Sequence, residues 1–271
     1  MPFIIILGSA FCNNGCYNKV WGMYGLKSKR TSEIIGRILL VSLLLAILFS
    51  AYRLVKAPSE VPEGMEHIKV KSDYLLMLLQ CTLGLVVMML PTVIERRWQL
   101  GITNGIYVLY YVFLYCAVFL GEVLEFYYLV PHWDTILHFF SGAMLGALGF
   151  ILVDILNRNE KVRVSLSPLF VAVFAFCFAL AAGAVWEIYE FSGDALLGLN
   201  MQKCLTEHSI PLVGYEALRD TMKDIVVDAL AAFGVSVMGY LSICKNREKV
   251  KDKEKISQFN LSDSDIAEQK A

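Results

Sequence analysis

Charged side chains are scarce in this 271-residue chain, where Asp, Glu, Lys and Arg together make up 18% of the residues, against roughly 25% in a typical soluble domain. No excess of basic residues is present, because the formal net charge is −1, so nothing in the charge balance favours a nucleic-acid partner. Hydrophobic residues account for 57% of the chain. This composition argues against a soluble enzyme, a disordered chain and a nucleic-acid-binding protein.

The apolar residues form six runs, each long enough for a membrane-spanning helix of about 20 residues. Lipid offers no hydrogen-bond partners to the backbone, so the spanning segments must be helical. We therefore predict an all-α, polytopic transmembrane helical bundle over residues 33–245, embedded in the lipid bilayer of the cell (inner) membrane. The predicted spans are 33–53, 73–94, 102–130, 133–156, 168–191 and 220–244.

The two ends of the chain differ from this bundle in composition. Residues 1–32 are predicted to be an extramembrane or interfacial segment, because the apolar run FIIILGSAF is too short to span a bilayer and no basic stretch precedes it. Cys12 and Cys16 form a C-x3-C there without a nearby His; buried thiols are the commoner role for such a pair, and metal binding is the alternative. Residues 246–271 are predicted to be a charged, disordered tail.

Lysine and arginine are distributed unevenly between the two predicted membrane sides. With six spans both termini share one side, which collects 17 of the basic residues and leaves 7 on the other. Cytoplasmic segments carry the excess of Lys and Arg. We therefore predict that both termini are cytoplasmic.

Acidic residues gather at the predicted outer ends of spans three to six. The nine acids there are Glu122, Glu125, Asp134, Glu187, Glu190, Asp194, Asp220, Asp224 and Asp228. Residues three or four apart share one helix face, so the acids of spans four, five and six are one-sided. The sets are Asp134 with His138, Glu187 with Glu190, and Asp220 with Asp224 and Asp228. Glycines continue two of these faces, which indicates that they pack against other helices.

The predicted depth of the acidic residues in the membrane creates an energetic problem, because an unpaired charge at mid-bilayer costs at least about 2.5–3.5 kcal/mol. The deep acids require a cation, a proton or a water-filled vestibule. Carboxylates with one imidazole suit Mg²⁺, Mn²⁺ or Ca²⁺, and Zn²⁺ less well. The predicted ligands of this divalent cation are Asp134, His138, Glu187 and Asp224.

Simpler roles stay open for several of these residues. Asp134 and Asp220 stand where helix N-caps are expected. His138 can be an interior histidine satisfied by hydrogen bonds. Glu122 and Glu125, which are further candidates for the polar cluster, can instead face solvent.

Three motifs resemble a known bacterial family. W-D-x3-H-F-x2-G begins at Trp133, W-E-x2-E begins at Trp186, and D-T-x2-D-x3-D begins at Asp220. In this order they resemble the YjdF-like inner-membrane proteins and, more distantly, the VanZ-like membrane proteins. Glu190 and Asp228 depart from the VanZ-like pattern, which has amides there. The resemblance covers residues 122–239 and implies a compact helical bundle with an acidic polar cluster, without an established reaction.

Three functions fit these residues. The first is a cation-dependent hydrolase or transferase acting on an envelope lipid or its precursor, with Glu190 or Asp228 as general base and with Arg219 and Lys223 receiving a lipid phosphate. The second is a proton- or cation-coupled transporter, in which buried acids line a pathway. The third is a non-catalytic membrane protein whose acidic cluster is structural.

Overall fold

The computed structural model describes residues 22–60, 68–98, 102–158, 166–204 and 212–268, and these residues form helices without any β-strand. Their bounds are α2 Gly22–Lys56, α3 Lys71–Met88, α4 Leu90–Trp98, α5 Asn104–Leu114, the π-helix η2 Tyr115–Val123, α6 Phe126–Leu129, α7 Trp133–Arg158, α8 Pro168–Leu197 and α9 Tyr215–Glu268. Cys12 and Cys16 lie outside the described residues.

Six helical segments are long and apolar enough to cross a membrane, which confirms the predicted all-α bundle with six spans. α3 and α4 together form the second segment, and α5 continues into η2 to form the third. That third segment ends at Val123, short of the predicted residue 130. The reason is local, since Glu125 takes a left-handed conformation with φ 61° and the short helix α6 follows it.

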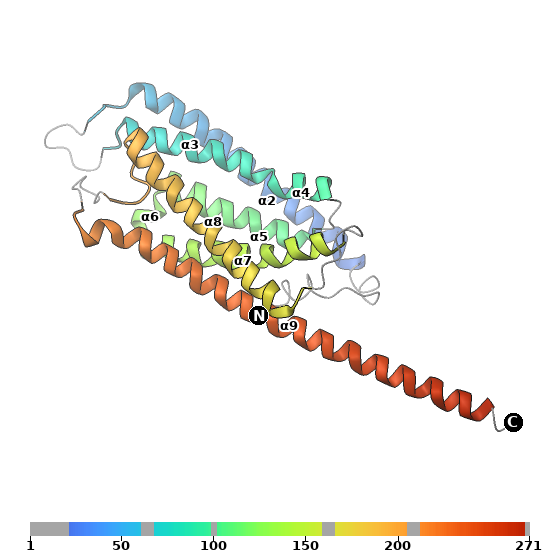
Figure 1. Cartoon of the computed structure of the whole chain (residues 1–271). Helices are drawn as coiled ribbons and strands as arrows, with labels where there is room; N and C mark the ends of the chain where they lie inside the picture. Colours follow the sequence, from blue (N-terminus) through green and yellow to red (C-terminus); the bar gives the residue numbers. More distant parts are fainter. Residues whose placement is uncertain (1–21, 61–67, 99–101, 159–165, 205–211, 269–271) are drawn as a thin grey trace.

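The end of the chain also differs from the prediction. Instead of a disordered tail after residue 245, α9 continues as one helix to Glu268 and extends well past the other helices (Figure 1). The run KNREKVKDKEK is rich in Lys, Glu and Arg, which are among the stronger helix formers. A charged composition therefore did not imply the absence of secondary structure.

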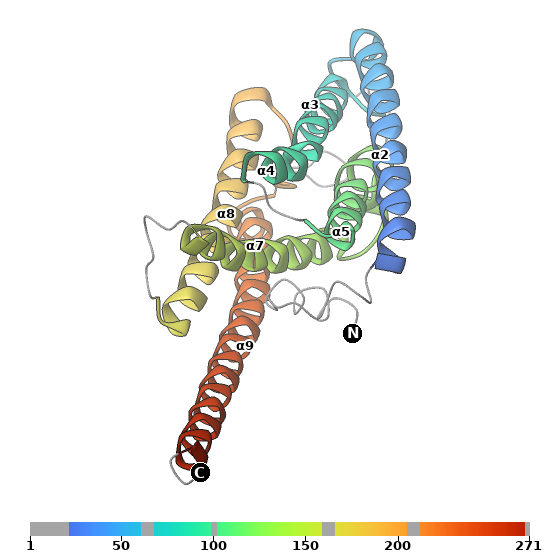
Figure 2. The same ribbon diagram turned by 90° about the vertical axis from the view of Figure 1, so that its right-hand side faces the viewer.

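The helices pack as two groups (Figures 1 and 2). The N-terminal group consists of α2, α3, α5 and η2, and the C-terminal group consists of α7, α8 and α9. The ends of α2 and α8, the starts of α3, α7 and α9, and the whole of α6 lie at one end of the bundle (left in Figure 1), which we call the α6 end.

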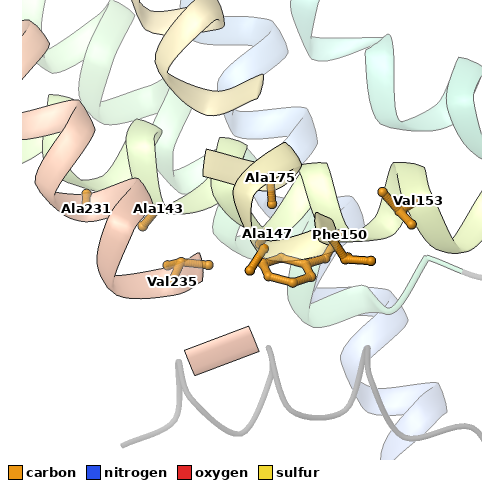
Figure 3. Packing of buried hydrophobic residues seen from close by; sticks show 9 residues of the cluster. Ala143, Ala147, Phe150, Val153, Ala175, Ala231 and Val235 are labelled. Carbon is orange, nitrogen blue, oxygen red and sulfur yellow. The ribbon is translucent and has the colours of Figure 1, made fainter. Parts of the chain in front are cut away.

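Each group has its own hydrophobic core. The N-terminal core is built mainly from larger side chains, namely Leu39, Leu43, Met77, Cys81, Leu114 and Val118 with Ala46. Small residues dominate the C-terminal core, where Ala143, Ala147, Ala175 and Ala231 surround Phe150 and Val235 (Figure 3). Small side chains let membrane helices approach closely, and the polar site lies in this second group.

Candidate functional site

Five ionisable side chains from three helices meet in the C-terminal group. Asp134 and His138 come from α7, Glu187 from α8, and Asp224 and Asp228 from α9. Four of the five are buried, with exposed fractions of 8% for His138, 5% for Glu187, 3% for Asp224 and 2% for Asp228. Residues distant in sequence are thus brought into one cluster, which we call the acid–histidine cluster.

His138 lies at the centre of this cluster. Its Nε2 is 3.9 Å from Asp134 Oδ1 and 3.9 Å from Glu187 Oε1. On the opposite edge of the ring, Nδ1 is 3.3 Å from Asp228 Oδ2. With its proton on Nδ1, His138 donates to Asp228 and turns the lone pair of Nε2 toward the two other carboxylates. A carboxylate on one imidazole nitrogen is the usual way of orienting a histidine whose other nitrogen binds a metal.

Asp228 has two further restraints that hold it in place. The Ser141 hydroxyl donates to Asp228 Oδ1 at 3.1 Å. Two glycines leave room for the aspartate: a Cβ at Gly183 would lie 2.5 Å from Asp228 Oδ2, and one at Gly142 would lie 2.7 Å from its backbone oxygen. The glycines therefore provide the close helix approach that lets the Asp228 carboxylate meet His138.

Lys203 lies at the Asp134 side of the cluster, in the connection between α8 and α9. Its backbone is left-handed, with φ 50°. Its ammonium group donates to Asp134 Oδ2 and sits 4.6 Å from the centre of the Tyr127 ring. Burial alone would lower the pKa of Lys203, but Asp134, Asp220 and Glu190 outweigh burial and raise it. The lysine is therefore held as a cation against the acids.

Tyr127 and Trp133 connect this end of the cluster to the N-terminal group. The Tyr127 hydroxyl donates to the backbone oxygen of Ala117 at 3.0 Å, and the Trp133 indole donates to that of Cys116 at 3.3 Å. Both acceptors belong to the π-helix η2. Since Trp133 begins α7, its bond to Cys116 also fixes the start of the helix that carries Asp134.

One subset of the cluster has spacings suited to a metal ion. Asp134, His138 and Asp224 each offer a ligand atom, and these atoms lie within 4.8 Å of one another. Oxygen ligands at about 2.3–2.6 Å from a Ca²⁺ ion can be this far apart across the ion. Glu187 Oε1 and Asp224 Oδ1 are buried without a hydrogen-bond partner, and a buried unpaired carboxylate oxygen is costly. These two oxygens are free to bind a cation.

The remaining predicted site residues are distributed around the cluster. Glu190 accepts a 2.9 Å hydrogen bond from the Trp186 indole and interacts electrostatically with Glu187 and Lys203. Asp220 interacts with Lys203 and Lys223. Asp220 is not an N-cap, because α9 already begins at Tyr215, and Asp134 likewise stands inside α7, which begins at Trp133.

Two other candidates lie away from the cluster, and a third lies beside it. Glu125 pairs with Lys69 at 2.8 Å, in the flank formed by the N-terminal group. Glu122 interacts electrostatically with Lys69 and also with Lys203, so it lies between that flank and the cluster. The Arg219 side chain is exposed. Lys203 meets Asp134, and Lys223 interacts electrostatically with Asp224.

Sequence reasoning missed the roles of Lys203, Ser141 and Tyr127. From the sequence, Lys203 was only one of the basic residues near the acids. It lies in the connection between α8 and α9, where helical periodicity gives no information about its partners. Ser141 has a detectable signal, because it lies three residues after His138 on the same helix face. Tyr127 has none, since its role depends on η2 and on the turn at Glu125.

Fold and cluster together define a polytopic helical membrane protein with a buried acid–histidine cluster near one end of its spans. The chain matches the model of the family described as "Predicted membrane protein (DUF2238)" over residues 35–245, and it belongs to this family. A Thermotoga maritima relative described as "Uncharacterized protein" is 28% identical over 130 residues, covering 48% of this chain and 57% of its own length. No solved structure matches the chain.

Proposed function

We propose that this protein is a divalent-cation-dependent hydrolase or transferase that acts on an envelope lipid or lipid-linked precursor at the α6 end of the bundle. The observation that carries the proposal is the set of unpartnered carboxylate oxygens around His138 Nε2. Asp134, His138, Glu187 and Asp224 would hold Mg²⁺, Mn²⁺ or Ca²⁺, with Zn²⁺ suited less well. A cation held there supplies a Lewis acid for a phosphoryl or acyl oxygen.

The other residues of the cluster then have separate roles. Asp228 orients His138 rather than serving as a base, since both of its carboxylate oxygens are engaged within the protein. Glu190 is the better general base, because it is only partly buried and accepts a hydrogen bond from the indole of Trp186 in its own helix. Lys203 is placed to receive an anionic group once a cation neutralises Asp134.

The orientation of the protein is part of the same proposal. The excess of Lys and Arg near the termini supports cytoplasmic ends in the inner membrane, which would turn the α6 end outward. The three motifs of the cluster support a YjdF-like assignment and a more distant kinship with VanZ-like proteins.

A structural role is the second candidate, and one observation favours it. The His138–Asp228 contact joins α7 to α9 at a point where both are buried, so the cluster can hold the bundle together without catalysis. Transport has less support. Farther from the α6 end than the cluster, the C-terminal core is filled by apolar side chains such as Ala147, Phe150 and Val235.

Metal content tests the proposal directly. Detergent-purified protein is loaded with Mn²⁺, desalted and measured by mass spectrometry of the metal. We expect wild-type protein to retain Mn²⁺ and both Asp224→Asn and Glu187→Gln to lose it. The matched control is Glu216→Gln, an exposed glutamate in the first turn of α9. Equal retention by all four proteins would contradict the cation site.

Catalysis is separated from a structural role by Glu190→Gln. If the protein is an enzyme, this variant keeps its metal and its melting temperature but loses the change in membrane lipid composition that the wild-type protein causes on expression, measured by lipid mass spectrometry. A structural cluster predicts the reverse pattern, with reduced thermal stability of Glu187→Gln and no effect of either protein on the lipids.

A further inference from the structure

A carboxylate of the acid–histidine cluster can offer a cation one oxygen or two, and this number affects which cation fits best. Ca²⁺ takes about six to eight oxygen ligands at about 2.3–2.6 Å and accepts carboxylates through both oxygens, whereas Mg²⁺ demands near-octahedral geometry with bonds of about 2.0–2.1 Å. Carboxylate and water ligands also suit Mn²⁺. The contacts around Asp134 therefore bear on the identity of the cation.

The two carboxylate oxygens of Asp134 face different partners. Oδ1 lies 3.9 Å from His138 Nε2, whereas Oδ2 accepts a hydrogen bond from the Lys203 ammonium group. A divalent cation bound to both oxygens would lie close to this ammonium group, and the two positive charges would repel each other. Lys203 thus leaves Asp134 only Oδ1 with which to bind a cation.

The connection between α8 and α9 holds Lys203 in this position. The backbone N–H groups of Met201 and Gln202 donate to the two carboxylate oxygens of Asp194 at 2.7 and 3.0 Å, which ties the connection to α8. The Gln202 side chain donates to Thr221 Oγ1 at 2.8 Å, which ties it to α9. The backbone that carries the ammonium group is therefore anchored to both helices.

The Tyr127 ring supports the ammonium group from the N-terminal helix group. Its centre lies 4.6 Å from Lys203 Nζ. The ring packs against Gly121 of η2, where an added Cβ would lie 2.5 Å from a ring carbon. The ammonium group is therefore held between an aromatic ring and the Asp134 carboxylate.

The other atoms around His138 suit a small cation. His138 Nε2 lies 3.9 Å from both Asp134 Oδ1 and Glu187 Oε1, and opposite ligands of an ion with Mg²⁺-like bonds lie about 4.0–4.2 Å apart. Asp228 adds no free oxygen, since His138 and Ser141 engage both. An imidazole nitrogen in place of an oxygen further disfavours Ca²⁺.

We propose that Lys203 is the residue that determines the cation specificity of the cluster: by occupying one oxygen of Asp134, it makes the site prefer Mn²⁺ or Mg²⁺ over Ca²⁺. The inference rests on the proposed function and narrows its choice of cation. Lys203 acts through Asp134, so it is a positioning residue rather than a ligand. Without the ammonium group, Asp134 can bind through both oxygens, and Ca²⁺ gains a ligand.

The ratio of two cation affinities tests this role. Equilibrium dialysis of the detergent-purified full chain, followed by mass spectrometry of the metals, gives dissociation constants for Mn²⁺ and Ca²⁺. We expect wild-type protein to bind Mn²⁺ at least about tenfold more tightly than Ca²⁺. Lys203→Met should reduce this ratio by about tenfold, which corresponds to 1.4 kcal/mol. An unchanged ratio in folded Lys203→Met would overturn the inference.

The ratio separates specificity from charge and from stability. Loss of one positive charge alters the affinities for two divalent cations alike, and a merely structural role of Lys203 would also leave their ratio unchanged. The matched control is Lys69→Met, which breaks the 2.8 Å ion pair with Glu125, a carboxylate outside the proposed ligands. We expect this control to keep the wild-type ratio. A shift as large as that of Lys203→Met would overturn the assignment to Lys203.

The wild-type measurement keeps the inference falsifiable even if Lys203→Met does not fold. Wild-type protein that binds Ca²⁺ as tightly as Mn²⁺ would overturn the inference and leave the proposed cation site in place. Failure to bind either cation would instead overturn the proposed function, and this inference with it. Tight Mn²⁺ binding with an unchanged ratio in Lys203→Met would overturn the inference alone.

Discussion

The two helix groups solve the problem of packing in a membrane differently. The N-terminal group fills its interior with large apolar side chains such as Leu39, Leu43 and Met77. The C-terminal group brings its backbones together over alanine and glycine, as at Ala175 and Gly142. Buried ionisable groups are concentrated in the second group. Close backbone approach and buried charge therefore belong together, because a carboxylate removed from water needs partners from neighbouring helices within hydrogen-bond distance.

The buried polar groups provide the sharpest test of this difference. Asp228→Ala removes the carboxylate that meets His138 and Ser141, and breaking a buried pair of this kind costs about 3–5 kcal/mol. Ser50 in the N-terminal group is also fully buried, but its hydroxyl donates to Ile47 within its own helix at 3.1 Å. Ser50→Ala should therefore cost about 1 kcal/mol. Thermal unfolding in detergent measures both, and similar losses would remove the distinction.

The ion pairs of the two groups give a smaller contrast. Lys203→Met leaves Asp134 without its ammonium partner, and a hydrogen bond to a charged group contributes about 1.5–3 kcal/mol. Lys69→Met breaks the more exposed pair with Glu125, which should cost less than about 1 kcal/mol. Detergent unfolding at neutral pH compares the two variants. A larger loss for Lys69→Met would contradict the assignment of the buried pair to the C-terminal group.

The Lys203 pair also has a defined pH dependence. Because its carboxylate neighbours raise the pKa of Lys203, the stabilisation is complete below the ordinary lysine value of about 10.4. It is lost only as the pH rises through the higher pKa of the folded protein. The stability difference between wild-type protein and Lys203→Met should therefore stay constant from neutral pH to about 10, as unfolding measured across this range would show.

Helix spacing gives a further contrast, which is tested by adding one methyl group. A Cβ at Gly142 would lie 2.9 Å from the Asp228 Cα atom, whereas one at Gly84 in α3 would make ordinary contacts at 3.4 Å with Leu43 and Val118. Gly142→Ala should cost about 1–3 kcal/mol by overpacking. Gly84→Ala should be neutral or stabilising by up to about 1 kcal/mol, because alanine favours helix. A neutral Gly142→Ala would show that α7 and α9 can separate freely.

Much of the fold could be predicted from composition and periodicity. The span of α7 at Trp133–Leu156 agrees with the prediction, because long apolar runs in lipid leave the helix as the available structure. The third span could not be bounded correctly, since the turn at Glu125 depends on its left-handed backbone. The helical continuation of α9 to Glu268 was missed because net polarity was given more weight than helix propensity.

The candidate site, like the fold, could be predicted only in part from the sequence. Helical spacing placed Asp134 with His138 on one face, and Asp224 with Asp228 on another, and these faces do meet. Spacing within one helix cannot show which helices are neighbours, however. The pairing of Glu125 with Lys69, and the interaction of Glu122 with both Lys69 and Lys203, therefore could not be predicted. Lys203 could not be assigned either, because its position depends on the connection between α8 and α9.

Amino-acid order was thus sufficient for the membrane-spanning helices, the faces on which their acids lie and the requirement for neutralising partners, since these follow from hydrocarbon length, helical repeat and the cost of buried charge. The choice of partners came from the packing of α7, α8 and α9. That packing places Asp228 behind His138, leaves oxygens of Glu187 and Asp224 unpaired, and brings Lys203 onto Asp134. Such contacts depend on distances of a few ångströms between segments far apart in the chain, which no local pattern specifies.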